Sequence, residues 1–235
     1  MRIAVLSDTH GNLTAFEAVL ADIDARGVDQ ILHLGDVVGK GPRGSACCTL
    51  ARQRCDVVLR GNWDVDILLG EETFPSDPLQ WWREELSDAD QDWLGLLPFC
   101  VDMSMGGRNF RAFHASSGSV HHRIFQTQID DEWEAMFENT LATGYDRKPD
   151  VVIYGDIHRA YVLAVGDRTV INCGSVGNPF DGVSACYLLL ESTAEGLEFQ
   201  LIRVQYDIER ELSVARKIRM PRYRKWEHML RTGTA

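Results

Sequence analysis

Asp8 and His10 stand two residues apart, directly after a short apolar run that is typical of a β-strand. In an extended chain, residues two apart point to the same face, so both side chains can reach one point in space. A carboxylate oxygen and an imidazole nitrogen together suit a divalent metal of intermediate hardness. The residues that follow predict a helix that begins at once, with Thr14 as its capping residue and Glu17 reaching back to it.

The same arrangement returns along the chain, because four more strand-like runs end in residues that can bind metal. These residues are Asp36, Asn62, His114 and the pair Asp156 and His158. The carboxyl ends of strands line the ligand crevice of an open α/β sheet, so we expect all seven side chains to converge there. Seven oxygen and nitrogen donors are too many for one ion, but they suit two ions about 3.5–4 Å apart. Asp36, alone on a tight turn, is the natural bridge, although each donor taken singly could equally cap a helix, fill the core or support a turn.

Strand-like and helical segments alternate through the first half of the chain, and the second half is richer in strands. This order predicts an α/β fold, a four-layer α/β/β/α sandwich in which two packed mixed sheets are flanked by helices. The predicted strands are 3–6, 30–34, 56–60, 109–113, 150–154 and an antiparallel run of 161–165, 169–172, 185–190 and 198–204; the predicted helices include 13–23, 45–54, 129–141 and 207–218. Because the chain lacks repeats and linkers, we predict one domain over 1–235, with a helical insert at about 66–97 and a basic helical tail at about 207–235.

The composition argues against several classes of function. The chain has 235 residues and a formal net charge of −11, which opposes long-range attraction to a nucleic acid polymer. No apolar run approaches the roughly 20 residues that span a bilayer, and the N-terminus enters a strand instead of a signal peptide. We therefore expect a cytoplasmic protein with no membrane partner. The six cysteines show no zinc-binding spacing, and in a cytosolic chain of this size we expect all of them to be reduced.

The charges are unevenly placed along the sequence. The segment 71–92 holds eight acidic residues opposed only by Arg83, whereas 216–225 holds six basic residues and no acidic one. Each run could be a solvated face. The alternative is that the basic tail docks on the acidic insert, either in its own chain or in a second copy, which would make the protein a homo-oligomer.

The motifs of the predicted metal site form a recognisable series: Asp8-x-His10, Gly35-Asp36, Gly61-Asn62-x-Asp64, His114 and Gly155-x-x-His158. This series resembles the calcineurin-like metallophosphoesterases, and it looks closest to their small bacterial and archaeal phosphodiesterase branch. The likeness covers nearly the whole chain, because 172–179 and 204–207 also resemble segments of that branch.

The resemblance implies a position for every donor. It implies that the first metal ion is held by Asp8, His10 and His158, that the second is held by Asn62, His114 and Asp156, and that Asp36 bridges the two. The cofactors would be two divalent ions, with Mn²⁺ as the first choice and Fe²⁺, Mg²⁺ or Zn²⁺ as alternatives.

The resemblance also implies a metal-dependent phosphoric ester hydrolase. We expect a phosphodiesterase that hydrolyses small or nucleotide phosphodiesters by a metal-bound hydroxide, with Asp36, Asn62 and His114 acting through metal coordination. Asn12 and Arg60 are candidates to contact the substrate phosphate, and the alternative for Arg60 is a salt bridge at a strand end. Other readings stay open: a protein phosphatase, a dinucleoside polyphosphate hydrolase, or a metal-binding scaffolding or regulatory module with no enzymatic activity.

Trp63 departs from the family pattern, because many members have a histidine there that protonates the leaving group. An indole only donates a hydrogen bond and does not titrate. Either the substrate has a good leaving group, or another residue supplies the proton, and His121 and His122 are the nearest candidates along the sequence. Trp63 could also bind substrate by stacking on a nucleobase, or simply pack against its neighbours.

Asp156 is a second departure, because family members usually have histidine at this position. Three carboxylates against two divalent ions leave a charge of about +1 in place of +2, which we expect to favour harder ions over Zn²⁺ and to acidify bound water less. We therefore predict that Asp156→His shifts the pH profile of phosphodiester hydrolysis to lower pH and raises the preference for Zn²⁺. An unchanged pH profile together with an unchanged metal preference would contradict this prediction.

Overall fold

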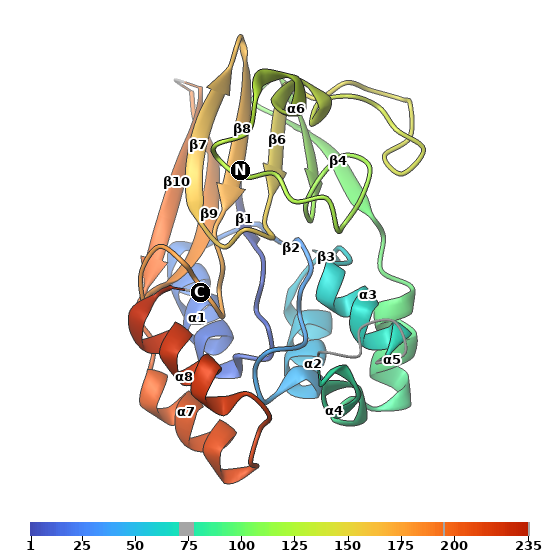
Figure 1. Cartoon of the computed structure of the whole chain (residues 1–235). Helices are drawn as coiled ribbons and strands as arrows, with labels where there is room; N and C mark the ends of the chain where they lie inside the picture. The colour runs from blue at the N-terminus through green and yellow to red at the C-terminus, as the bar shows by residue number, and fades with distance from the viewer. Residues whose placement is uncertain (71–77, 195, 235) are drawn as a thin grey trace.

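Two mixed five-stranded sheets form the centre of the computed structural model, which describes residues 1–70, 78–194 and 196–234 (Figure 1). The first sheet has the order β10-β9-β1-β2-β3, with β1, β2 and β3 parallel and with β9 antiparallel to both β1 and β10. Its strands are β1 (Arg2–Leu6), β2 (Gln30–His33), β3 (Val57–Val58), β9 (Ala185–Ser192) and β10 (Leu197–Val204).

The second sheet has the order β4-β5-β6-β8-β7, in which β5, β6 and β8 are parallel and the edge strands β4 and β7 are antiparallel to their neighbours. Its strands are β4 (Cys100–Met105), β5 (Arg108–Phe113), β6 (Val151–Tyr154), β7 (Ala160–Val165) and β8 (Arg168–Cys173). The predicted antiparallel run is therefore two separate pairs, β7 with β8 in this sheet and β9 with β10 in the other. Strand β4 was not predicted from the sequence.

Alternation along β1 explains why the molecule has four layers. Ile3 and Val5 point into the apolar core between the two sheets, whereas Ala4 and Leu6 point to the helices on the outer face of the first sheet. All four side chains are almost completely buried. A strand that is apolar on both faces must be covered on both sides, and the predicted four-layer α/β/β/α fold is confirmed.

Helices cover both outer faces. The outer face of the first sheet packs on α1 (Leu13–Arg26), α2 (Gly44–Arg54) and the short helices α3 (Asn62–Leu69), α4 (Leu79–Glu84) and α5 (Asp88–Gly95); the second sheet packs on α6 (Asp130–Ala135). The predicted cap of α1 is wrong, because Asn12 is the capping residue and its Oδ1 accepts from the Ala15 amide at 3.1 Å. Thr14 instead donates its hydroxyl to Glu211 Oε2 at 2.7 Å.

All six cysteines are free, as predicted. Four of them, Cys47, Cys48, Cys173 and Cys186, are fully buried and act as small apolar core residues. Within the described residues, no helix combines the length and the apolar character that crossing a membrane requires.

The basic tail forms two helices, α7 (Ile208–Lys217) and α8 (Tyr223–Thr232), which lie side by side next to α1 (Figure 1). Their buried faces share one apolar cluster that includes Leu212 and Trp226, and Trp81 of the helical insert packs against it. The basic tail and the helical insert therefore contact each other through apolar side chains. Residues 71, 72 and 77 of the acidic run lie outside the described residues.

Glu211 ties α7 to the rest of the fold. Its side chain is completely buried, and its Oε2 accepts from the hydroxyl of Thr14 and from the guanidinium of Arg43. Arg43 precedes α2, so this single carboxylate joins the first, second and seventh helices. Such a buried ion pair adds little net free energy of folding, because desolvation offsets the attraction between its charges. Loss of one partner, however, leaves the other charge buried and uncompensated.

We predict that Glu211→Ala lowers the free energy of unfolding by about 2–4 kcal/mol, since it strands the Arg43 guanidinium in a mostly buried site. Glu209→Ala on the same helix is the matched control, because Glu209 pairs with Arg231 at the exposed surface and should cost less than about 1 kcal/mol. Urea denaturation followed by tryptophan fluorescence measures both. Equal losses in the two variants would contradict the role given to Glu211.

Candidate dinuclear metal centre

The seven predicted metal-binding side chains lie together at one edge of the two sheets. Each follows the carboxyl end of a strand: β1, β2 and β3 of the first sheet, and β5 and β6 of the second. Packing of the two sheets brings these ends together, and hydrogen bonds join neighbouring loops, including those from the amides of Asp8 and His10 to the carbonyls of Gly35 and Asp36, each at 2.9 Å. All seven side chains are at most 7% exposed.

One half of the cluster contains Asp8, His10, Asp36 and His158, whose nearest donor atoms all lie within 4.8 Å of one another. His10 Nε2 is 3.3 Å from Asp36 Oδ2, and His158 Nε2 is 3.3 Å from Asp8 Oδ1. The two Nε2 atoms are 3.2 Å apart. Two imidazoles and two carboxylates therefore face one small volume, as a divalent cation requires.

The other half lies on the opposite side of Asp36. His114 Nε2 is 3.0 Å from Asn62 Oδ1, 3.5 Å from Asp36 Oδ1 and 3.9 Å from Asp156 Oδ1. Asp36 thus presents Oδ2 to His10 and Oδ1 to His114. This is the geometry expected of a carboxylate shared by two ions.

The three histidines are held by main-chain carbonyls. Nδ1 of His10, His114 and His158 lies at hydrogen-bond distance from the carbonyl oxygens of Val38, Leu34 and Asn178, respectively. A carbonyl only accepts, so each Nδ1 must donate, and the lone pair of each neutral imidazole sits on Nε2, which faces the cluster. Such outer contacts fix the orientation of metal-binding histidines.

Several carboxylate oxygens in the cluster lack a hydrogen-bond partner among the described residues. They are Asp8 Oδ1 and both oxygens of Asp156. Buried carboxylate oxygens without a hydrogen bond are costly. Here Asp8 Oδ1 lies 3.3 Å from His158 Nε2, and Asp156 Oδ1 lies 3.9 Å from His114 Nε2. The donor set and these oxygens fit two divalent cations.

The family description of the calcineurin-like phosphoesterase superfamily domain matches residues 1–195 of the sequence. The chain belongs to the calcineurin-like phosphoesterase superfamily. This superfamily consists of phosphoesterases that depend on dinuclear metal centres, which agrees with the buried Asp and His cluster. The predicted resemblance is thereby confirmed at the level of the family.

Individual relatives extend this match to the C-terminus. The chain is 28% identical over 234 residues to an uncharacterized protein of Methanocaldococcus jannaschii, with 94% of each chain covered. It is similar to the crystal structure of a metallophosphoesterase from Sphaerobacter thermophilus (27% identity, 99% of both chains, TM-score 0.75). A hypothetical protein from Pyrococcus horikoshii shares the fold at 19% identity and a TM-score of 0.79, with 99% of this chain and 98% of that chain covered.

The backbone at the candidate metal centre has an uncommon conformation. Asp8, His10, Asp36, Asp156 and His158 all have positive φ, between 48° and 62°. Non-glycine residues seldom adopt this left-handed region, and its cost of order 1–3 kcal/mol each must be met by the surrounding structure. The bends turn both members of each Asp-x-His-type pair towards the cluster.

The pKa values of the clustered side chains reflect how closely their charges are buried together. Burial raises the pKa of Asp36 well above its ordinary value, with Asp8 and Asp64 adding to the effect. Burial lowers the pKa of His114, but the carboxylates of Asp36, Asp8 and Asp156 outweigh it and raise that pKa to about 9. Negative charge gathered in this way attracts cations.

Asp64 organises the loops around the centre. Its Oδ2 accepts from the amides of Asp36 and Gly61 at 2.8 and 2.9 Å, and its Oδ1 accepts from those of Val37 and Val38 at 3.0 and 3.2 Å. A Cβ on Gly61 would lie 2.1 Å from Asp36 Oδ1, so only glycine fits there. Asp64 therefore fixes the position of the bridging Asp36.

The other predicted site residues have different surroundings. Asn12 is a correction: it is fully buried, caps α1 and donates Nδ2 to the Gly177 carbonyl and the Tyr206 hydroxyl, so its amide is committed within the fold. Trp63 lines a cavity beside the cluster and meets the His10 ring edge-on at 5.9 Å. The predicted phosphate contact of Arg60 has no support here, because the described lining of this cavity does not include it.

The two histidines proposed as proton donors also lie outside the described lining of that cavity. His121 Nε2 is 2.7 Å from Asp66 Oδ1, and His122 lines a different cavity, where it faces Glu132.

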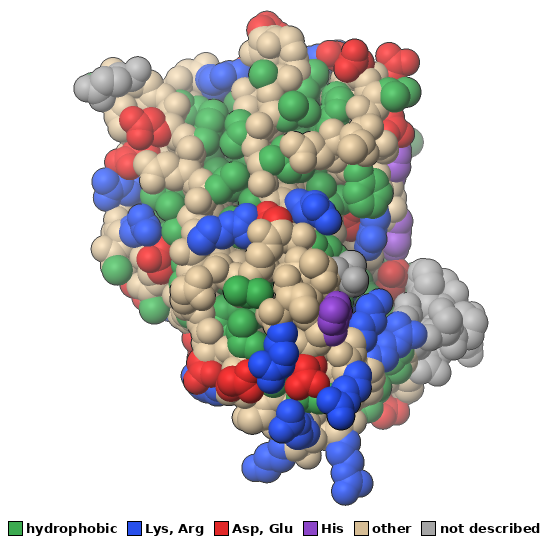
Figure 2. All heavy atoms as spheres, turned by 60° about the vertical axis from the view of Figure 1, so that its left-hand side comes forward, with side chains coloured by type: hydrophobic (Ala, Val, Ile, Leu, Met, Phe, Trp, Pro, Cys, Tyr) green, Lys and Arg blue, Asp and Glu red, His purple; other side chains and the backbone are tan. Residues whose placement is uncertain are grey.

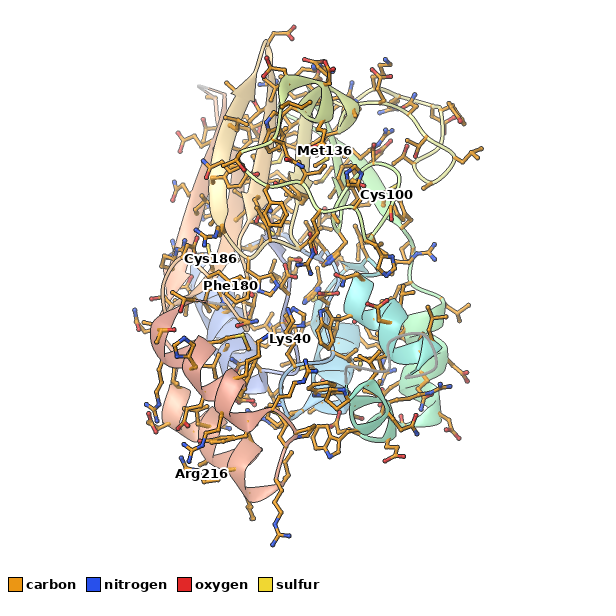
Figure 3. All side chains as sticks on the ribbon, in the orientation of Figure 1. Lys40, Cys100, Met136, Phe180, Cys186 and Arg216 are labelled. Atoms are coloured by element: carbon orange, nitrogen blue, oxygen red, sulfur yellow. The ribbon has the colours of Figure 1, made fainter. Side chains whose placement is uncertain are left out.

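Two positively charged side chains at the candidate centre were not predicted from the sequence. Lys40 Nζ lies 2.8 Å from His10 Nε2, and Arg123 Nε lies 3.3 Å from Asp156 Oδ1. Burial lowers the pKa of Lys40 to about 8. Figure 3 shows Lys40 near the middle of the molecule. The only sequence signal for Lys40 is its place in the glycine-rich loop four residues after Asp36.

We predict that Asp64→Asn lowers the affinity for Mn²⁺ about 10–100-fold, because an amide cannot accept four main-chain N–H groups and the support of Asp36 is lost. Isothermal titration calorimetry measures the affinity. Asp66→Asn, on the same helix but paired with an exposed histidine, is the control and should bind Mn²⁺ like the unchanged protein. Equal affinities in both variants would refute the positioning role of Asp64.

Proposed function

We propose that this protein is a Mn²⁺-dependent phosphodiesterase that hydrolyses small or nucleotide phosphodiesters. The observation that carries the proposal is the position of Asp36 between two half-sites, each with its own imidazole and carboxylate donors. When bound, the two ions would supply an activated water and electrostatic stabilisation of the phosphoryl oxygens. A water oxygen bonds to phosphorus and gives up a proton, the bond from phosphorus to the leaving oxygen breaks, and the departing alkoxide takes up a proton to become an alcohol.

The residues around the cluster favour a diester with a good leaving group. Lys40 and Arg123 lie where cations can bind the non-bridging oxygens of a phosphate. Trp63 stands at the cavity wall in place of a titratable group and cannot protonate a departing alkoxide. A general acid contributes least when the leaving alcohol has a low pKa, because its alkoxide can depart without first being protonated.

We expect the protein to hydrolyse bis-p-nitrophenyl phosphate in the presence of Mn²⁺, and to lose that activity when EDTA removes the metal. Asp36→Ala should lower the rate by about 10²-fold or more, since it removes the ligand shared by both ions. Asp24→Ala changes an exposed carboxylate paired with Arg54 and serves as the control. Release of p-nitrophenol measures all three.

The alternatives give different results in the same assay. A scaffolding or regulatory module would bind Mn²⁺ in calorimetry without any turnover, and a monoesterase would hydrolyse p-nitrophenyl phosphate faster than the diester. Either result would overturn the proposal.

A further inference from the structure

A cavity of about 440 Å³ opens beside the buried cluster of candidate metal ligands, two of which, Asp156 and His158, form part of its wall. This volume lies within the range of roughly 300–1,000 Å³ that is usual for small-molecule sites. The cavity is thus placed to hold the part of a substrate that is not cleaved.

The wall of this cavity is strongly basic in an acidic protein. It carries five Lys or Arg side chains, and Asp156 is the only carboxylate among its described residues, although the formal net charge of the chain is −11. Lys40 and Arg123 face the metal cluster. The other three, Arg159, Arg222 and Lys225, are exposed side chains, and Figure 2 shows Lys and Arg gathered over the C-terminal helices.

Flat aromatic groups line the same cavity. Phe180 stacks on the His158 ring at 4.7 Å with an interplanar angle of 12°, so it extends an aromatic surface outward from the cluster. Trp63 and Trp82 pack edge-on at 5.6 Å, and Phe125 is 47% exposed. Such surfaces stack well on a nucleobase, at about 1–3 kcal/mol per base.

Helix α8 supplies one side of the cavity through Lys225, Trp226 and Met229, together with Arg222, the residue before the helix. It lies beyond residues 1–195, which the family description matches. Trp226 is 1% exposed and packs in the α7–α8 cluster, so the wall is firmly held. Its Nε1 is buried with no hydrogen-bond partner among the described residues.

We propose that this cavity binds a nucleotide with at least two phosphate groups, and that α8 determines this specificity. A diester carries one negative charge, which the metal centre, Lys40 and Arg123 can neutralise. The further cations Arg159 and Lys225 call for a second phosphate, and the aromatic walls call for a base. A nucleic acid polymer fits less well, because the net charge of −11 repels a long polyanion. The inference rests on the proposed function in that the metal centre is where the ester is cleaved.

Binding of ADP to the metal-free protein tests the proposal without turnover. In calorimetry with EDTA present, we expect ADP to bind more tightly than AMP, pyrophosphate or adenosine. Lys225→Ala should weaken ADP binding about 10-fold, the loss of one charge-assisted hydrogen bond, and should change adenosine binding little. Arg224→Ala is the matched control, because Arg224 is adjacent on α8 but pairs with Glu227 away from the cavity.

A second variant tests the aromatic wall. Phe125→Ala, at a partly exposed position, should weaken ADP but leave pyrophosphate binding unchanged. The proposal is overturned if Lys225→Ala and Arg224→Ala bind ADP equally, if pyrophosphate binds as tightly as ADP, or if a single-stranded oligonucleotide binds more tightly than ADP. ADP binding without phosphodiester hydrolysis would refute the proposed function alone, whereas hydrolysis of bis-p-nitrophenyl phosphate without ADP binding would refute this inference alone.

Discussion

The structure depends on the burial of three carboxylates and three imidazoles at one point. Asp8, Asp36 and Asp156 are nearly inaccessible to water, and like charges repel strongly where the dielectric constant is low. Such a cluster is stable only with positive charge among its members. Burial by itself would raise the pKa of Asp8, but the neighbouring His158 opposes burial and holds this pKa below its usual range. Lys40 places its ammonium group beside the imidazoles of His10 and His158. A pair of divalent cations would satisfy the same demand more completely.

The fold stabilises this cluster because its side chains are contributed by many rigid elements. Parallel strands of both sheets end at the same edge, so no single loop has to carry all the donors. The left-handed residues at Asp8, Asp36 and Asp156 are held by main-chain hydrogen bonds between loops and by the carboxylate of Asp64. The α8 helix then closes the adjoining cavity from a part of the chain distant in sequence.

The convergence of the candidate donors could be predicted from sequence because each one follows an apolar strand within a few residues, and the position of a strand in the sheet fixes where its end points. The four-layer fold followed from the same pattern. The prediction for Asn12 failed because a polar residue after a metal motif can equally cap a helix, and its partners Gly177 and Tyr206 come from distant segments. The cavity wall could not be foreseen either, since the basic run of the tail shows charge but not which of its side chains face inward.

The most direct measurement of the central claim is anomalous diffraction from a crystal grown with excess Mn²⁺. We predict two anomalous peaks about 3.5–4 Å apart, with Asp36 between them, His10 and His158 beside one, and His114 and Asn62 beside the other. A single peak, or two ions with His114 and Asp156 turned away from Asp36, would contradict it.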